Sequence, residues 1–92
     1  MTNPTKVTRS RFEIVQDGLT SSLEFETDGQ GWMTLWHTEV PGPLRGRGLA
    51  LELVTTAFQY ANDHGLKVDV VCPVAHHLVQ THPEFQALVG RR

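Results

Sequence analysis

The feature that most constrains the fold is a change of hydrophobic period at Gly48. Before this residue, apolar and polar side chains alternate in three short segments, which is typical of half-buried β-strands. After it, apolar residues recur at intervals of three and four, which predicts one face of an amphipathic helix. The predicted strands span residues 11–15, 19–26 and 32–40, and the helix stripe consists of Ala50, Leu53, Val54, Ala57, Phe58 and Ala61. The chain therefore starts as a meander of three strands and continues as a helix.

The segment after this helix predicts a return to the same sheet. Gly65 is typical of the residue that ends a helix, and residues 67–72 alternate as a fourth strand. Pro73 suits the first turn of a second helix, which extends to about His82, and residues 84–89 form a last helical turn. Because strand–helix–strand crossovers are right-handed, the third and fourth strands become parallel neighbours. We therefore predict an α+β fold of order β-β-β-α-β-α, with a small mixed β-sheet and helices packed on it.

Length and composition limit the chain to one domain. With 92 residues it can bury one core but not two, so we predict a flexible N-terminal segment over residues 1–10 and a single domain over 11–89. The net charge is −2 and the basic residues are scattered, which argues against a nucleic-acid partner. No run of about 20 apolar residues is present, the chain start has no apolar signal core, and Cys72 is the single cysteine. We therefore expect no membrane partner, no structural disulfide and a cytoplasmic location.

A glycine-rich loop joins the third predicted strand to the first helix. The first N–H groups of a helix lack internal partners and the helix dipole is positive there, so glycines at this point let an anion approach the backbone. Two arginines add positive charge that does not titrate. The loop consists of Arg45, Gly46, Arg47, Gly48, Leu49 and Ala50. We interpret it as a pyrophosphate site, and the alternative is a solvated turn that carries two arginines.

Runs of sequence on both sides of the loop form a pattern with it. They are residues 37–41, 44–50, 65–68, 72–73 and 82–85. Within the second run, Arg45, Gly48 and Ala50 match the signature Gln/Arg-x-x-Gly-x-Gly/Ala in register. The chain thereby resembles the GCN5-related N-acetyltransferase superfamily, and in particular a miniature single-domain subgroup with a Cys-Pro after the fourth strand. The resemblance covers residues 11–89, nearly the whole predicted fold.

This resemblance implies a truncated acetyltransferase-like fold that takes acetyl-CoA as co-substrate. The loop amides of residues 45–50 would bind the pyrophosphate of CoA. The backbone near Val40 would pair with the pantetheine arm, at the point where the third and fourth strands splay apart. The acetyl group would then point toward the ends of those strands, and the acceptor would be an amine or a protein that the sequence does not identify.

Cys72 is the first candidate for chemistry, because it closes the fourth predicted strand and precedes a helix. A helix N-terminus favours the thiolate, which is the nucleophilic form of cysteine. In the subgroup that the chain resembles, a cysteine at this position lies near the thioester, where it accepts the acetyl group or lines the pocket. The residue type alone leaves a second interpretation, a small buried hydrophobe. His76, four residues further on, could approach the thiol on the same helix.

His37 and Glu39 are the candidates for a general base. They are two residues apart, so they share a strand face, on which Met33 and Leu35 precede them. This face becomes polar as the strand nears the loop. An amine must lose a proton before it attacks a thioester, and either side chain can take that proton directly or through water. The alternative is a solvated strand end.

The histidines after Cys72 raise the question of a zinc site. On a helix, His76 and His77 diverge by about 100° and His82 lies roughly 140° from His77, so no metal site is predicted. Acetyltransferases often carry a tyrosine on this helix that protonates the leaving thiolate. The matching position here is Leu78, which leaves the protonation step without an assigned residue.

Trp32 and Trp36 share one face of the third predicted strand. We interpret them as core or sheet cover rather than as a platform for the acceptor.

Together these observations predict a CoA-dependent N-acetyltransferase that moves an acetyl group from acetyl-CoA to an unknown amine acceptor. Leu78 at the tyrosine position leaves an alternative, a CoA- or acyl-CoA-binding module without turnover. A protein-interaction domain without a ligand is the third hypothesis.

Overall fold

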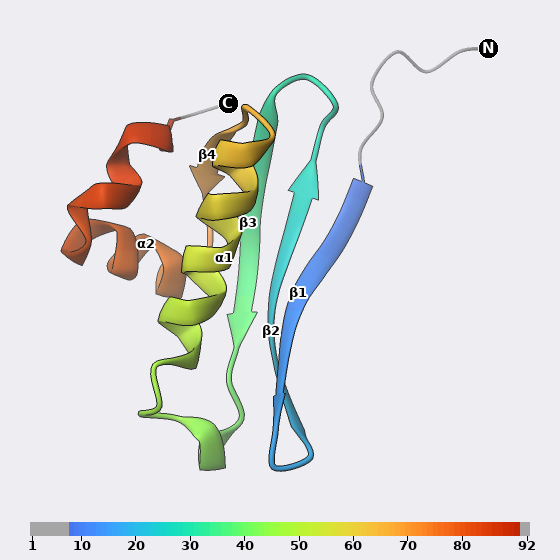
Figure 1. The fold of residues 1–92 in the computed structure, drawn as a ribbon, viewed down its shortest axis with the longest axis vertical. Helices are drawn as coiled ribbons and strands as arrows, with labels where there is room; N and C mark the ends of the chain where they lie inside the picture. Colours follow the sequence, from blue (N-terminus) through green and yellow to red (C-terminus); the bar gives the residue numbers. More distant parts are fainter. Residues whose placement is uncertain (1–7, 91–92) are drawn as a thin grey trace.

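One four-stranded sheet organises the chain, with its strands in the order β1-β2-β3-β4 (Figure 1). The computed structural model describes residues 8–90. The strands are β1 (Thr8–Gln16), β2 (Leu19–Thr27), β3 (Trp32–Glu39) and β4 (Lys67–Val70). The first three pair antiparallel, and β4 joins β3 in parallel. The predicted mixed sheet and the parallel pairing of the third and fourth strands are confirmed.

Two helices and two short 3-10 turns follow the meander in the predicted order. They are η1 (Gly42–Leu44), α1 (Leu49–Asp63), α2 (Pro73–Thr81) and η2 (Pro83–Leu88). Gly48 precedes α1 with a φ of 77°, and Gly65 follows the helix with a φ of 67°. This left-handed conformation is favoured for glycine, because a side chain there collides with the backbone. The two glycines therefore set where α1 begins and ends.

The core lies between one face of the sheet and the two helices. Five residues of the α1 stripe, Leu53, Val54, Ala57, Phe58 and Ala61, are buried there together with Ala75 and Val79 of α2, whereas Ala50 is half-buried. The sheet contributes Leu23, Phe25, Met33, Leu35 and Val68. Burial of one such large side chain contributes roughly 1.5–3 kcal/mol. Because both helices pack on the same face, no helix within residues 8–90 covers the other face, which we call the open face.

A β-bulge in β3 changes which side chains face the helices. Leu35 lies opposite Phe25 on β2, but His37 lies opposite Glu24, so Trp36 is an extra residue in β3. An extra residue reverses the alternation beyond it. The expectation that His37 continues the face of Leu35 is therefore wrong. His37 lies on the open face, as Glu39 does, and Thr38 takes the position toward the helices.

The ends of the described chain differ slightly from the predicted boundaries. Residues 8–10, which were expected to be flexible, belong to β1, whereas residues 1–7 lie outside the described part. β4 ends at Val70 rather than at residue 72. Val89 forms a parallel bridge with Val68, and the N–H of Gly90 donates to the Val68 carbonyl over 2.9 Å. Within residues 8–90, every helix is too short or too polar to cross a bilayer.

Candidate functional site

The glycine loop forms an open recess at the start of α1. The first helical hydrogen bond runs from the N–H of Glu52 to the carbonyl of Gly48 over 3.1 Å. The N–H groups of residues 49–51 therefore have no partner inside the helix. The recess has a volume of about 130 Å³ and is lined by Val40, Leu44, Arg45, Gly46, Gly48, Leu49 and Ala50. Its shape and its free donors suit an anion.

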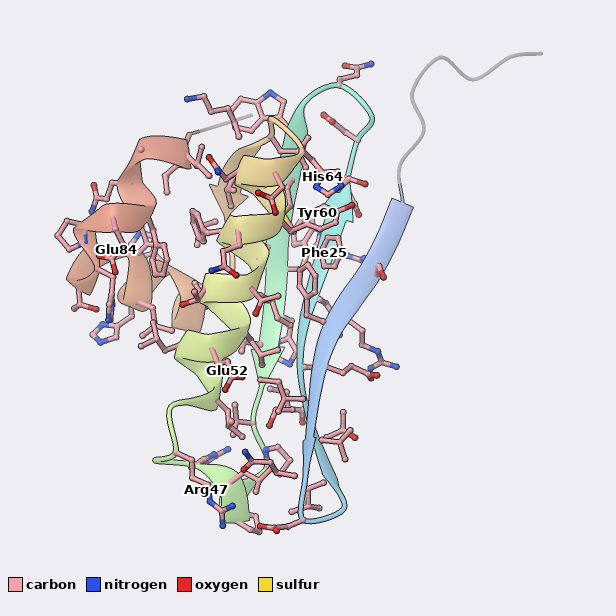
Figure 2. The ribbon with its side chains drawn as sticks, in the orientation of Figure 1. Phe25, Arg47, Glu52, Tyr60, His64 and Glu84 are labelled. Carbon is pink, nitrogen blue, oxygen red and sulfur yellow. The ribbon has the colours of Figure 1, made fainter. Side chains whose placement is uncertain are left out.

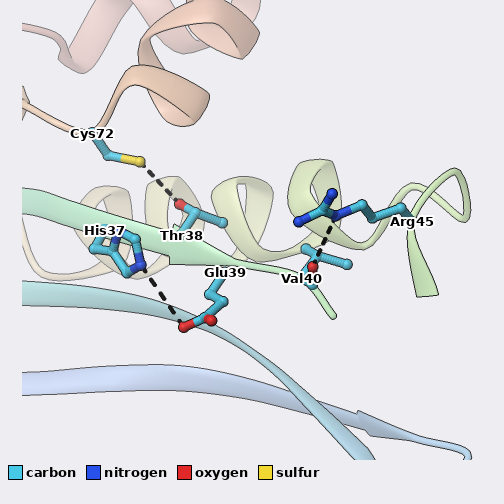
Figure 3. A network of polar contacts seen from close by, with 6 residues as sticks. All are labelled: His37, Thr38, Glu39, Val40, Arg45 and Cys72. Carbon is cyan, nitrogen blue, oxygen red and sulfur yellow. Dashed lines mark hydrogen bonds and ion pairs between the residues drawn. The ribbon is translucent and has the colours of Figure 1, made fainter. Parts of the chain in front are cut away.

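The two loop arginines have different surroundings. Arg45 lines the recess, and its Nε donates to the carbonyl of Val40 over 3.2 Å (Figure 3). Arg47 does not line the recess. Its Nη1 donates to Asp17 Oδ2 over 2.9 Å and to Gln16 Oε1 over 3.3 Å, in the turn between β1 and β2. The structure therefore brings six of the seven predicted cofactor-binding residues together and ties the seventh, Arg47, to the hairpin.

β3 and β4 part just before Cys72. The carbonyl of Leu35 accepts hydrogen bonds from both Val71 N–H, over 3.1 Å, and Cys72 N–H, over 2.9 Å. Beyond Leu35 no residue of β4 pairs with β3, so the edge of residues 36–40 is unpaired on that side within the described chain. The gap between the two strands, which we call the β3–β4 gap, lies beside the start of α2.

Cys72 lies at this gap on the helix side of the sheet. It is the N-cap residue of α2 and is 1% exposed. Its Sγ lies 3.2 Å from Oγ1 of Thr38, which is 8% exposed (Figure 3). Sequence analysis missed Thr38, because strict alternation places it on the open face. The signal was present, since the apolar face of Met33 and Leu35 stops abruptly at His37, as it does when a bulge reverses a strand.

His37 and Glu39 lie on the opposite side of β3 from Cys72 (Figure 3). His37 Nε2 is 3.8 Å from Glu39 Oε1, and their side chains are 59% and 71% exposed. They therefore form a solvent-accessible pair rather than a contact with the thiol.

The remaining histidines lie away from the thiol. The backbone N–H of His76 donates to the Cys72 carbonyl over 2.9 Å, but its side chain lines a different recess, together with Asp69 and Gln80. His82 Nδ1 lies 2.8 Å from the carbonyl of Leu78. Within residues 8–90, no three side chains of His, Cys, Asp or Glu lie close enough together to hold a metal ion.

Neither Leu78 nor Tyr60 supplies an acid at the gap. Leu78 is a partly buried residue of α2 packed against the core. Tyr60 stacks on His64, with 4.0 Å between ring centroids, and lies close to Phe12 and Phe25 (Figure 2). Tyr60 is therefore held in an aromatic group over β1 and β2, in the C-terminal half of α1.

The architecture and the loop define the class of protein. A meander of three strands, a glycine loop before a helix and a parallel fourth strand together make an acetyltransferase-like α+β fold. Residues 11–88 match the sequence profile of the family described as "GCN5-related N-acetyl-transferase". The chain therefore belongs to the GCN5-related N-acetyltransferase family.

Individual proteins are also similar to this chain. The chain is 35% identical over 66 residues to "Protein NATD1" of Xenopus tropicalis and to that of Homo sapiens, an overlap of 72% of this chain. The overlap spans 61% and 58% of those relatives, so the chain matches less than two thirds of their length. In fold, it is similar to the crystal structure of a "putative acetyltransferase" from Agrobacterium tumefaciens. That similarity has a TM-score of 0.60 and 23% identity, and it covers 88% of this chain and 60% of that one.

Proposed function

We propose that this protein transfers an acetyl group from acetyl-CoA to an amine. The observation that carries the proposal is the continuity of three features along β3. The recess at the start of α1 includes Val40, the unpaired edge of β3 runs back from there, and Thr38 contacts Cys72. Val40 and Thr38 are two residues apart, about 7 Å along a strand. An extended ligand can therefore place its anionic end at the loop and its reactive end beside the gap.

Each part of the cofactor has a matching group on the chain. The free N–H groups of residues 49–51, with the positive end of the α1 dipole, suit the pyrophosphate. Arg45 adds a fixed positive charge at the rim of the recess. The unpaired edge of residues 36–40 offers backbone donors and acceptors to the amides of the pantetheine arm. The family assignment supports acetyl-CoA as the donor that these groups bind.

The reaction then needs an amine without its proton beside the thioester carbon. The amine nitrogen forms the new C–N bond, the C–S bond breaks, and CoA leaves as a thiolate that takes up a proton. His37 or Glu39 accepts the amine proton from the open face. Cys72 has two possible roles within this proposal. It either takes the acetyl group first, as a thioester, or lines the pocket while the amine attacks acetyl-CoA directly.

A cytoplasmic location is part of this proposal. Cys72 is a free and buried cysteine, and such a thiol stays reduced in a reducing compartment.

Intact mass spectrometry after exposure to acetyl-CoA tests the chemistry, with peptide mapping of any added acetyl group. Release of free CoA is followed in parallel with a panel of amines. Amine-dependent release above the rate in buffer supports transfer, and an acetyl group on Cys72 supports the two-step route. Absence of amine-dependent release with every amine would contradict the enzymatic proposal.

A CoA-binding module without turnover is the second candidate function. The position of Leu78, packed against the core, favours it, since this side chain cannot donate a proton to a leaving thiolate. Under this alternative, CoA raises the thermal midpoint, because a ligand selective for the folded state stabilises it. The parent protein is never acetylated, and Cys72→Ala binds CoA as the parent does. If neither CoA nor acetyl-CoA moves the midpoint, a protein-interaction domain without this ligand is what remains.

A further inference from the structure

A second recess lies between α1 and η2, on the helical side of the molecule, and has a volume of about 630 Å³. Its floor includes Phe58 of α1 and Phe85 of η2, which stack with 4.7 Å between ring centroids. The partly buried Leu88 lines it beside them. We call this recess the α1–η2 groove. Within residues 8–90 it shares no lining residue with the recess at the glycine loop, so it is a separate surface.

One rim of the groove is a row of polar side chains on α1. Thr55, Gln59 and Asn62 follow one another at intervals of four and three residues, which places them on one face of the helix. The carboxamides of Gln59 and Asn62 each offer donors and an acceptor, which match the N–H and C=O groups of a peptide backbone. Residues 55–63 extend about 12 Å along the helix axis. This is the length of about three or four residues of an extended chain.

Two carboxylates line the groove without a cation beside them. Asp63 is the last residue of α1, and Glu84 lies in the first turn of η2 (Figure 2). Within residues 8–90, neither of them forms an ion pair. His64 follows Asp63 but stacks on Tyr60 and does not line the groove. The groove therefore carries two negative charges, one from each of the elements that form it.

The C-terminal end of α1 adds to this negative charge. The last carbonyl groups of a helix have no partner inside it, and the helix dipole is negative there. A basic side chain commonly compensates this end, but the last turn of α1 contains none and closes on Asp63. A carboxylate at such a position is unfavourable for the helix. A cation bound beside Asp63 removes this repulsion, so the position favours a positively charged ligand.

We propose that the α1–η2 groove docks a partner protein through a short extended segment that carries an arginine. The methylene stem of the arginine packs on the apolar floor, and its guanidinium reaches Asp63 and Glu84. A guanidinium presents five N–H donors in a planar fork that matches carboxylates, and it is more weakly hydrated than an ammonium group. Gln59 and Asn62 pair with the backbone of the same segment. This inference does not depend on acetyl transfer, because the groove lies outside the proposed cofactor site.

Three capped tetrapeptides serve as probes. The first carries one arginine among alanine and leucine residues, the second carries lysine in its place, and the third carries citrulline, the uncharged isostere of arginine. Each is titrated into isotope-labelled protein while backbone amide resonances are followed by NMR. We expect the arginine peptide to shift amides of residues 55–63 and 83–88, and to bind more tightly than the lysine peptide. The citrulline peptide should bind more weakly by roughly 4- to 25-fold, the product of two exposed ionic contacts.

Substitutions at the two carboxylates test the assignment. Asp63→Asn and Glu84→Gln should each weaken binding of the arginine peptide by about 2- to 5-fold, the range for one exposed ionic contact. Glu52→Gln removes an exposed carboxylate of the same helix that does not line the groove, and we expect no change. Asp63→Asn also removes the unfavourable charge at the end of α1, so its thermal midpoint should equal or exceed that of the parent. Weaker binding by this variant is then not a consequence of unfolding.

Several results would overturn the proposal. They are an arginine peptide that shifts no amide of the groove, equal binding of the arginine and citrulline peptides, or an equal effect of Glu52→Gln and Glu84→Gln. A dimer in sedimentation that Asp63→Asn and Glu84→Gln dissociate would assign the groove to a second copy instead. Binding of the peptide only after Arg91→Ala and Arg92→Ala would assign it to the chain's own last residues. Each of these results leaves the acetyl-transfer proposal standing, because release of CoA tests that proposal separately.

Discussion

Replacement of Gly48 by alanine separates the role of the loop in folding from its role in binding. Gly48 has a φ of 77°, and a Cβ atom added there meets nothing within 4 Å. The cost of the substitution is therefore local backbone strain rather than a clash with distant groups, and the left-handed region costs a residue with a side chain roughly 1–2 kcal/mol. For a domain of this size, 1 kcal/mol corresponds to a change of about 4–8 °C in the thermal midpoint.

Gly65 supplies a matched control at the other end of the same helix. Its φ is 67°, and a Cβ atom there also meets nothing within 4 Å. The two glycines are separated by the 15 residues of α1, roughly 22 Å. Gly48→Ala and Gly65→Ala should therefore destabilise the fold by similar amounts. Only Gly48→Ala changes the backbone that presents the free N–H groups of residues 49–51 to a ligand.

The assay is the thermal midpoint with and without CoA. A ligand at 100 times its Kd adds about 2.7 kcal/mol of stability, which is on the order of 10 °C here. We expect Gly65→Ala to keep this increment, whereas a tenfold loss of affinity in Gly48→Ala removes about 1.4 kcal/mol of it. Equal increments in the two variants would refute the assignment of the loop as the anion site.

Three further predictions concern the neighbouring contacts. Thr38→Val removes the hydroxyl beside Cys72, which should lower the free energy of unfolding in urea by no more than about 1 kcal/mol and slow the acetylation of Cys72. Thr38→Ser should restore the acetylation rate. Equal acetylation rates in Thr38→Val and Thr38→Ser would argue against a role for the hydroxyl. Asp17→Asn should release Arg47 from the hairpin and raise the affinity for CoA measured by calorimetry, whereas Arg47→Ala should lower that affinity. Unchanged affinity in both variants would exclude Arg47 from the site. Leu35→Ala, at a fully buried position, should lower the free energy of unfolding by about 2–5 kcal/mol, and a loss below 1 kcal/mol would contradict the core described above.

The sequence predicts the parts of the fold that depend on local physics. Gly48 and Gly65 mark the ends of α1 because their backbone conformation is one that other residues avoid. Pro73 marks the first turn of α2 for a similarly local reason, its fixed φ. The parallel pairing of β3 and β4 follows from the handedness of crossovers and needs no knowledge of side-chain contacts.

The missed features depend on contacts between distant parts of the chain. Arg47 and Asp17 are 30 residues apart in sequence, and nothing in the loop indicates that the hairpin reaches it. The end of the apolar face at His37 hints at a bulge in β3, but only the pairing of β2 with β3 identifies Trp36 as the extra residue, because alternation within one strand does not reveal its register against another. That one residue decides that Thr38, and neither His37 nor Glu39, contacts Cys72.

The hydrogen bonds to the Leu35 carbonyl bear on which substitutions the β3–β4 gap can tolerate during evolution. It accepts two N–H groups, and in this way the main chain itself turns β4 away from β3. The opening is therefore a property of the backbone rather than of any side chain that lines it. Replacement of Cys72, or of residues along the rim, changes the chemistry offered there without closing the opening. Related sequences can therefore carry a different reactive group at this position and still keep the β3–β4 gap.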